Sequence, residues 1–100
     1  MKYSEKQVAV VLALENLVHK RFNKDSLEKE LSKIFKEPIK IELGYEDVDC
    51  FPDWNYMFTS ENDEIGGDFD IYVLKHKNTD IWGNTMLVTE INVDFFYPGQ

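Results

Sequence analysis

The change from helices to strands is predicted at Pro38, within residues 25–45, which read DSLEKELSKIFKEPIKIELGY. Before the proline, apolar residues recur every three or four positions, which is the period of a helix with one buried face. After it they alternate with polar residues, which is the period of a strand. Proline removes a helical hydrogen bond and disfavours helical backbone in the residue before it. We therefore predict helix up to about residue 36 and strands beyond the proline.

Two helices are predicted upstream of this boundary. The first spans about residues 4–22, with Ser4 as its N-cap and Gln7 completing a capping box. The second spans about residues 25–36 and begins at Asp25 as its N-cap. Apolar residues cover most of the circumference of the first helix, which indicates burial on two sides or a place in an oligomer interface. Packing between the second helix and the sheet is the simpler interpretation.

Four strands are predicted downstream, over about residues 39–46, 54–60, 68–76 and 85–97. Each alternates apolar with polar residues, and short loops separate them. Such runs predict an antiparallel sheet with one face turned toward the helices. The fold class is therefore α+β in the order ααββββ, with residues 1–100 as a single domain.

The other face of this predicted sheet is less polar than strict alternation requires. Its apolar and aromatic members are Met57, Tyr72, Leu74, Met86, Val88 and Phe96, and its acids are Asp70, Glu90 and Asp94. An apolar centre with an acidic rim is typical of a contact surface. A solvated face with scattered apolar residues is the alternative.

Composition limits the classes of function. The chain has 100 residues, of which 43% are hydrophobic and 14% aromatic, enough to build a core. Cys50 is its one cysteine, so neither an internal disulfide nor a multi-cysteine metal site can form. The apolar run from Val8 to Leu14 has only seven residues and no small-residue cleavage site after it, which argues against a signal peptide, and it is far too short for a membrane span. We expect a cytoplasmic protein without a cofactor.

The charge of the chain is segregated along the sequence. Residues 1–40 carry nine Lys/Arg and six Asp/Glu, whereas residues 41–100 carry two Lys/Arg and thirteen Asp/Glu. The formal net charge is −8. An acidic half without counter-charge disfavours binding to nucleic acid or anionic lipid and favours encounter with a basic partner. Solubility alone is the alternative explanation.

Motifs that would indicate an enzyme are missing or incomplete. Residues 65–71 read IGGDFDI, and their D-x-D resembles the metal-binding carboxylates of nucleotidyltransferases, but the helical insertion that this family places after its glycines is missing. Residues 61–64 begin like a calcium loop, yet the oxygen ligands expected further along are replaced by apolar and aromatic residues. His19 and His76 lack the neighbours of a metal site. We predict no catalytic residues and no metal site.

The sequence favours an inhibitor or immunity protein that occludes the active or substrate-binding cleft of a basic partner such as a bacterial nuclease toxin. In size and composition the chain is similar to bacterial toxin-immunity proteins. Acids would steer and pair with the partner's cations, and aromatic residues would anchor it. The predicted partner-binding residues are Asp47, Asp49, Phe51, Asp53, Trp54, Glu61, Asp63, Glu64, Asp68 and Asp70.

Three alternatives remain open from the sequence. One is a nucleic-acid mimic of the kind that phages use against defence nucleases. Another is a ligand-binding or enzymatic domain with a pocket between helices and sheet, for which the polar candidates are Tyr45, Asp53, Tyr56 and His76. The third is a homodimer formed through the first helix or the outer sheet face. For Trp54, a core position is also an open interpretation.

Overall fold

The computed structural model describes residues 3–46, 53–76 and 83–97. Its elements, in chain order, are α1 (Glu5–Glu15), β1 (Arg21–Phe22), α2 (Lys24–Phe35), β2 (Glu42–Glu46), β3 (Asp53–Ser60), β4 (Gly67–Lys75) and β5 (Met86–Phe95). The predicted α+β class is confirmed, and the longer strands lie close to their predicted positions. The predicted order ααββββ is wrong in one respect, because a fifth, two-residue strand separates the helices.

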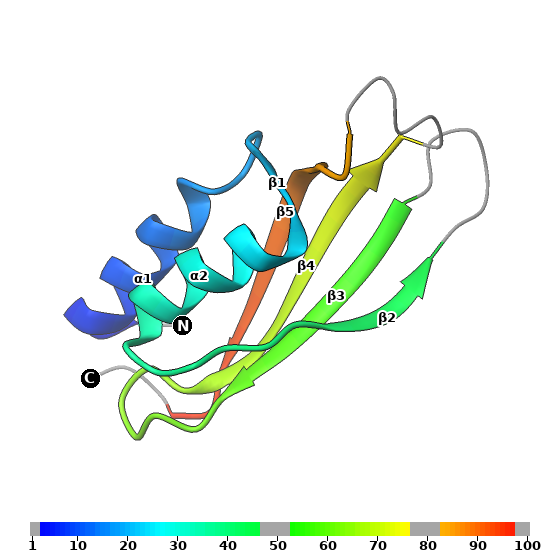
Figure 1. The fold of residues 1–100 in the computed structure, drawn as a ribbon. Helices are drawn as coiled ribbons and strands as arrows, with labels where there is room; N and C mark the ends of the chain where they lie inside the picture. Colours follow the sequence, from blue (N-terminus) through cyan, green and yellow to red (C-terminus); the bar gives the residue numbers. More distant parts are fainter. Residues whose placement is uncertain (1–2, 47–52, 77–82, 98–100) are drawn as a thin grey trace.

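The strands form one antiparallel sheet in the order β1-β5-β4-β3-β2. Both helices lie on the same face of this sheet, with α1 beside β5 and α2 beside β1 (Figure 1). The face toward the helices is called the inner face below, and the opposite one the outer face.

The first helix is shorter than its apolar pattern predicts. The predicted capping box is confirmed, since the Ser4 hydroxyl accepts from the Gln7 N–H and the Gln7 side chain accepts from the Ser4 N–H. The helix nevertheless ends at Glu15, and His19 has a positive φ of 70°. The His19 N–H then donates to the Val88 carbonyl at 2.7 Å. Pairing with β5 thus replaces the last predicted turns of helix and starts β1.

The second helix begins one residue earlier than predicted, with a different cap. Asn23, rather than Asp25, is the N-cap, and its side chain accepts from the Ser26 N–H at 2.8 Å. The Ser26 hydroxyl in turn accepts from the Asn23 N–H, which completes the box. At the other end Lys36 adopts a left-handed conformation, and Pro38 follows shortly, as the sequence indicates.

The core lies between the helices and the inner face. Its fully buried large side chains include Leu14 from α1, Leu27, Leu31 and Phe35 from α2, and Phe69 and Ile71 from β4. Phe35 contacts both Phe58 and Phe69, with ring centroids 5.6 and 5.0 Å apart. The expectation that α1 is buried on two sides is only partly met. Val10 and Leu14 are buried, but Val8 and Leu12 remain 42% and 56% exposed.

A β-bulge changes which residues of β5 face the core. Tyr72 pairs with Glu90 and Val73 pairs with Val88, so Thr89 is an extra residue without a partner on β4. Its hydroxyl donates to the Tyr72 carbonyl at 3.0 Å. Because one extra residue reverses the alternation, the sequence assignment of the start of this strand to the outer face is wrong. Met86 and Val88 are buried in the core instead.

Candidate protein-interaction surface

The outer face of β2–β5 is a layer of side chains that no described helix covers. Strand pairing places opposite residues on the same face, so its membership follows from the register. These residues are Glu42 and Tyr45 from β2, Asn55, Met57 and Thr59 from β3, Asp68, Asp70, Tyr72 and Leu74 from β4, and Leu87, Glu90, Asn92 and Asp94 from β5. This set is the candidate surface.

The centre of this surface is apolar and rests on a buried amide. Met57 is 43% exposed, and Tyr72 lies half-buried nearby. Asn55, directly opposite Tyr72, is buried, and its side-chain NH₂ donates to the Tyr56 carbonyl. A Cβ at Gly44 would lie 2.3 Å from the Asn55 Oδ1, so a larger residue there would force this amide to move. The side chains at the centre of this surface therefore pack against a buried amide group.

Carboxylates on three strands lie next to these residues. They belong to Glu42, Asp68, Asp70, Glu90 and Asp94. Asp68 and Asp94 lie directly opposite each other, although like charges in such positions destabilise a sheet. The Thr59 hydroxyl donates to Asp68 at 2.8 Å and orients that carboxylate. The ion pairs found among the described residues all join other groups.

Lys40 lies at the margin of the surface. A shallow hollow of about 660 Å³ is lined by Pro38 and Lys40 on one side and by outer-face residues such as Met57 and Asp70 on the other. The Lys40 Nζ lies 3.8 Å from the carboxylate of Glu28, and this carboxylate also accepts a hydrogen bond from the Ile41 N–H. Lys40 is thus directed toward an inner-layer carboxylate, and the middle of the outer face stays negative.

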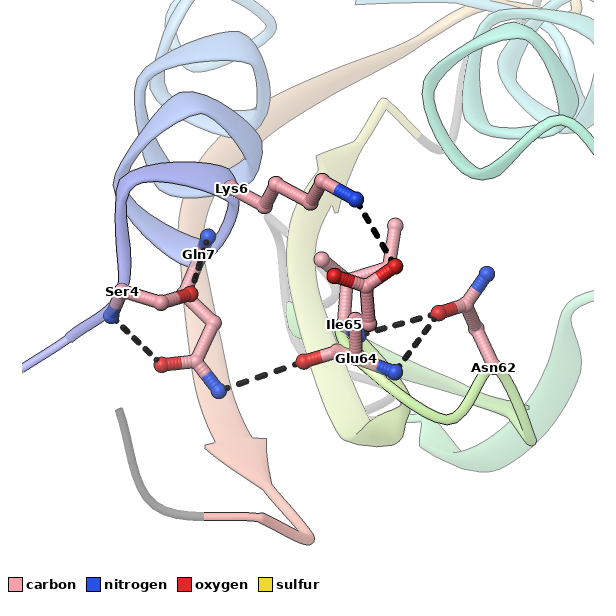
Figure 2. Close-up of polar contacts among 6 residues, drawn as sticks. All are labelled: Ser4, Lys6, Gln7, Asn62, Glu64 and Ile65. Atoms are coloured by element: carbon pink, nitrogen blue, oxygen red, sulfur yellow. Dashed lines mark hydrogen bonds and ion pairs between the residues drawn. The ribbon is translucent and has the colours of Figure 1, made fainter. Parts of the chain in front are cut away.

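The acidic β3–β4 loop is held against α1. The Lys6 ammonium lies 2.8 Å from the Glu64 carboxylate, and the Gln7 side chain donates to the Glu64 carbonyl (Figure 2). Inside the loop, the Asn62 Oδ1 accepts from the N–H groups of Glu64 and Ile65 at 2.8 and 3.1 Å. Glu64 therefore already has a counter-charge, whereas Glu61 and Asp63 are exposed beside it.

The remaining predicted partner-binding residues fall in different places. Asp68 and Asp70 lie on the outer face, but Trp54 lies on the inner face, where the Lys75 Nζ is 4.4 Å from its ring centroid. Asp53 is the first residue of β3, at the end of the strand away from the acidic loop. Asp47, Asp49 and Phe51 lie outside the described residues. The structure thus brings together only part of the predicted set.

Two polar residues of the alternative pocket lie on opposite faces of the sheet. Tyr45 pairs with Asn55 and lies on the outer face, whereas Tyr56 is buried on the inner face. His76 follows the end of β4, and Asp53 begins the neighbouring strand. The main hollows in the described part of the chain are lined by none of these four residues.

Sequence reasoning missed part of the acidic rim. Glu90 and Asp94 were assigned to the outer face but not to the predicted binding residues, and alternation along β5 was the signal that could have added them. The same signal could have added Glu42, which alternates with the buried Ile39 and Ile41 and lies opposite Met57 on the outer face.

The described part of the chain offers neither a metal site nor a membrane-spanning helix. Within residues 3–46, 53–76 and 83–97, no group of three or more His, Cys, Asp or Glu side chains is arranged to hold a metal ion. The helices of this described part are too short or too polar to cross a membrane. Comparisons of the chain with protein-family models, curated proteins and solved structures found no match.

Proposed function

We propose that this chain is a non-enzymatic module that binds a basic protein through the outer face of its sheet. One observation carries the proposal: carboxylates of Glu42, Asp68, Asp70, Glu90 and Asp94 lie around and between the exposed Met57 and the half-buried Tyr72, on a face left uncovered by the described helices. Acids in such positions steer a cationic partner toward the face and fix its orientation. The apolar side chains at the centre would be buried away from water when the complex forms.

The size of the face suggests how a partner would sit. Strands about 4.8 Å apart, with a rise of about 3.3 Å per residue, give four strands of eight residues a face of roughly 15 by 26 Å. A standard interface buries about 800 Å² on each partner, which is roughly twice that area. The partner would therefore extend past the sheet, and the acidic loop with Glu61 and Asp63 is the adjoining surface of matching charge.

Within this class, the function we favour is an inhibitor or immunity protein that neutralises a bacterial nuclease toxin. A nuclease must bind a polyanion, so its substrate cleft is basic. The carboxylates of this sheet face carry the same sign of charge as the nucleic-acid substrate of that cleft. They contain no bond that the nuclease could cleave. Binding there would block the cleft without any chemistry by this chain.

The protein encoded by the reading frame next to this gene is the partner to test. We expect it to encode a protein with a basic, nuclease-like region, and one equivalent of this chain should abolish the activity of that purified region. The double variant Asp68→Asn/Asp70→Asn keeps the shape of the face and should weaken inhibition at least tenfold. The matched variant Asp25→Asn/Glu30→Gln removes the same charge from α2 and should leave inhibition within twofold of the natural chain.

Two results would count against this proposal. An adjacent frame encoding a metabolic enzyme would argue against an immunity role. Inhibition that ignores both added salt and the Asp68→Asn/Asp70→Asn change would show that the outer face is not the contact surface. A small molecule that raises the melting temperature of the chain would instead favour the pocket alternative.

A further inference from the structure

A second feature that lacks a described partner is the outer side of β5, at the border of the sheet. Strand β1 pairs with only the start of β5, at Met86 and Leu87. Strand β5 continues to Phe95, well past this contact (Figure 1). Among the described residues, no strand pairs with this side of β5 beyond Val88. The second half of β5 is called the open edge below.

The register shows which backbone groups point away from the sheet at the open edge. The Phe96 N–H donates to the Gly66 carbonyl, on the β4 side. Hydrogen-bonded and non-hydrogen-bonded pairs alternate in an antiparallel ladder, so every second residue before Phe96 also turns its backbone groups toward β4. The N–H and carbonyl groups of Ile91, Val93 and Phe95 therefore point outward, where a further strand can bind them.

The two faces of the open edge differ in their chemistry. On the inner face, the side chains of Ile91, Val93 and Phe95 are apolar and only half-buried against the core. On the outer face, the strand carries the carboxylates of Glu90 and Asp94, and no ion pair among the described residues neutralises either of them. A strand added here would meet apolar side chains on one face and carboxylates on the other.

A hollow lies beside the open edge, at the end nearer β1. It has a volume of about 400 Å³ and is lined by Glu15, Val18 and His19 on one side and by residues 89–91 of β5 on the other. Val18 gives the hollow an apolar wall, and Glu15 and Glu90 give it carboxylates on both sides. A side chain with an aliphatic stem and a cationic end, such as lysine, matches both properties.

The open edge is protected against some strands and not against others. Proteins keep edge strands apart with proline, lysine, bulges or covering elements. Residues 91–95 contain no proline or lysine, and the bulge of β5 lies before them, at Thr89. The carboxylates of Glu90 and Asp94 repel an acidic strand and attract a basic one. A second copy of the chain carries the same carboxylates and a net charge of −8, so it is disfavoured at this edge.

We propose that the open edge binds an extended segment of a basic protein, which joins the sheet as a further antiparallel strand. Antiparallel addition continues the pairing of the described strands and is slightly more stable per residue than parallel pairing. The segment places apolar residues opposite Ile91 and Val93 and exchanges two backbone hydrogen bonds with each. It places Lys or Arg opposite Glu90 and Asp94. The recognised pattern is two cations four residues apart, with apolar residues next to them.

This inference deepens the proposed function and rests on it for the charge of the partner. The outer face alone is smaller than a standard interface. A strand added beside β5 adjoins that face along Glu90 and Asp94, and Asp94 in turn lies opposite Asp68. A basic partner on the outer face thus gains a main-chain attachment at its border.

Hydrogen exchange of the chain with a designed peptide tests the proposal. The peptide is a capped heptapeptide of valines, with lysine at its second and sixth positions and threonine at its fourth. At saturating peptide we expect exchange of the Ile91 and Val93 N–H groups to slow at least tenfold, because these groups then bond to the peptide instead of water. The Asn92 N–H, which already points toward β4, is the internal control and should change much less. A peptide with glutamate in place of lysine should bind at least tenfold more weakly.

A methylated peptide separates strand addition from attraction between charges alone. Methyl groups on the amide nitrogens of the two valines that flank the threonine block the hydrogen bonds to the edge and leave the charge unchanged. Binding should weaken at least tenfold, since main-chain hydrogen bonds supply the affinity of an added strand. In the chain itself, Val93→Pro removes an outward N–H and should have the same effect, whereas Val93→Ala keeps the N–H and is the matched control. The methylated peptide keeps the test independent of the folding of the proline variant.

Two results would overturn this inference. One is unchanged exchange at Ile91 and Val93 in millimolar lysine peptide. The other is a methylated peptide that binds as tightly as the original, because attachment then does not use the backbone of the edge.

The two proposals fail in distinguishable ways. Asp68→Asn/Asp70→Asn should weaken inhibition of a basic partner but leave the slowed exchange at Ile91 and Val93 in place, since both aspartates lie on β4, away from the edge. Peptide binding that ignores methylation and shifts only outer-face resonances would refute strand addition alone. Strand addition together with inhibition that ignores the Asp68→Asn/Asp70→Asn change would refute the outer face alone.

Discussion

The opposed carboxylates of Asp68 and Asp94 give a direct test of the electrostatic argument. They form a hydrogen-bonded pair of the β4–β5 ladder, so their Cα atoms lie about 5.5 Å apart, with both side chains on the outer face. Like charges in directly opposed positions cost a sheet roughly 0.2–1 kcal/mol. Asp94→Asn removes one charge and keeps the shape of the side chain. We therefore expect this variant to be more stable than the natural chain by about that amount.

Thermal unfolding at low ionic strength and fixed protein concentration measures the effect. For a domain of this size, 1 kcal/mol shifts the melting temperature by about 4–8 °C, so the expected rise is roughly 1–8 °C. In 1 M salt the screening length falls to about 3 Å, and the gain should nearly vanish. Glu61→Gln, which removes the same charge from an exposed loop, should change stability by less than about 0.5 kcal/mol.

Two outcomes would refute this reasoning. If Asp94→Asn is neutral or destabilising at low salt, the two carboxylates do not repel each other in the folded chain. If the gain persists unchanged in 1 M salt, its origin is not electrostatic. A salt-sensitive gain, together with weaker binding of a basic partner, would show that the acids are present at a cost to stability.

Other predictions concern the fold that presents the surface. Asn23→Ala should lower the free energy of unfolding in urea by about 1 kcal/mol, because it removes the N-cap of α2, whereas Asp25→Ala should lower it clearly less. Equal losses would contradict the assignment of Asn23 as the N-cap. Gly67→Ala should cost roughly 1–3 kcal/mol, because its Cβ would lie 2.3 Å from the Asp94 carbonyl oxygen; a stable variant would place β5 further away. Leu31→Ala should cost about 2–5 kcal/mol, since that side chain is fully buried in the core, and a loss below 1 kcal/mol would contradict this packing.

Much of the fold could be predicted because local patterns agree with the tertiary structure. The change of period at Pro38 separates helix from strand correctly, and the longer strands follow their alternation. The first helix was predicted too long because Leu17 continues the apolar spacing and is buried, although it follows the end of the helix. The residues after it pair with Val88. That pairing is a long-range contact, which local periodicity cannot report.

The candidate surface was harder to predict because it depends on strand register. One extra residue, Thr89, reverses the facing of the start of β5 and buries Met86 and Val88. A second bulge, at Gly44, places Tyr45 on the outer face. The sequence could indicate that the β half is acidic, but which acids share a face is decided by these bulges. The pairing of Glu64 with Lys6 also joins two distant segments.

The most direct test of the central claim is a chemical-shift map of the ¹⁵N-labelled chain titrated with a short peptide of arginine and lysine. We predict that the largest changes fall on the outer face, at Met57, Asp70, Tyr72 and Glu90, and that they disappear in high salt. The Asp68→Asn/Asp70→Asn variant should lose most of these changes. Shifts spread evenly over the molecule, or concentrated on the helices, would contradict the claim that the outer face is the binding surface for a basic partner.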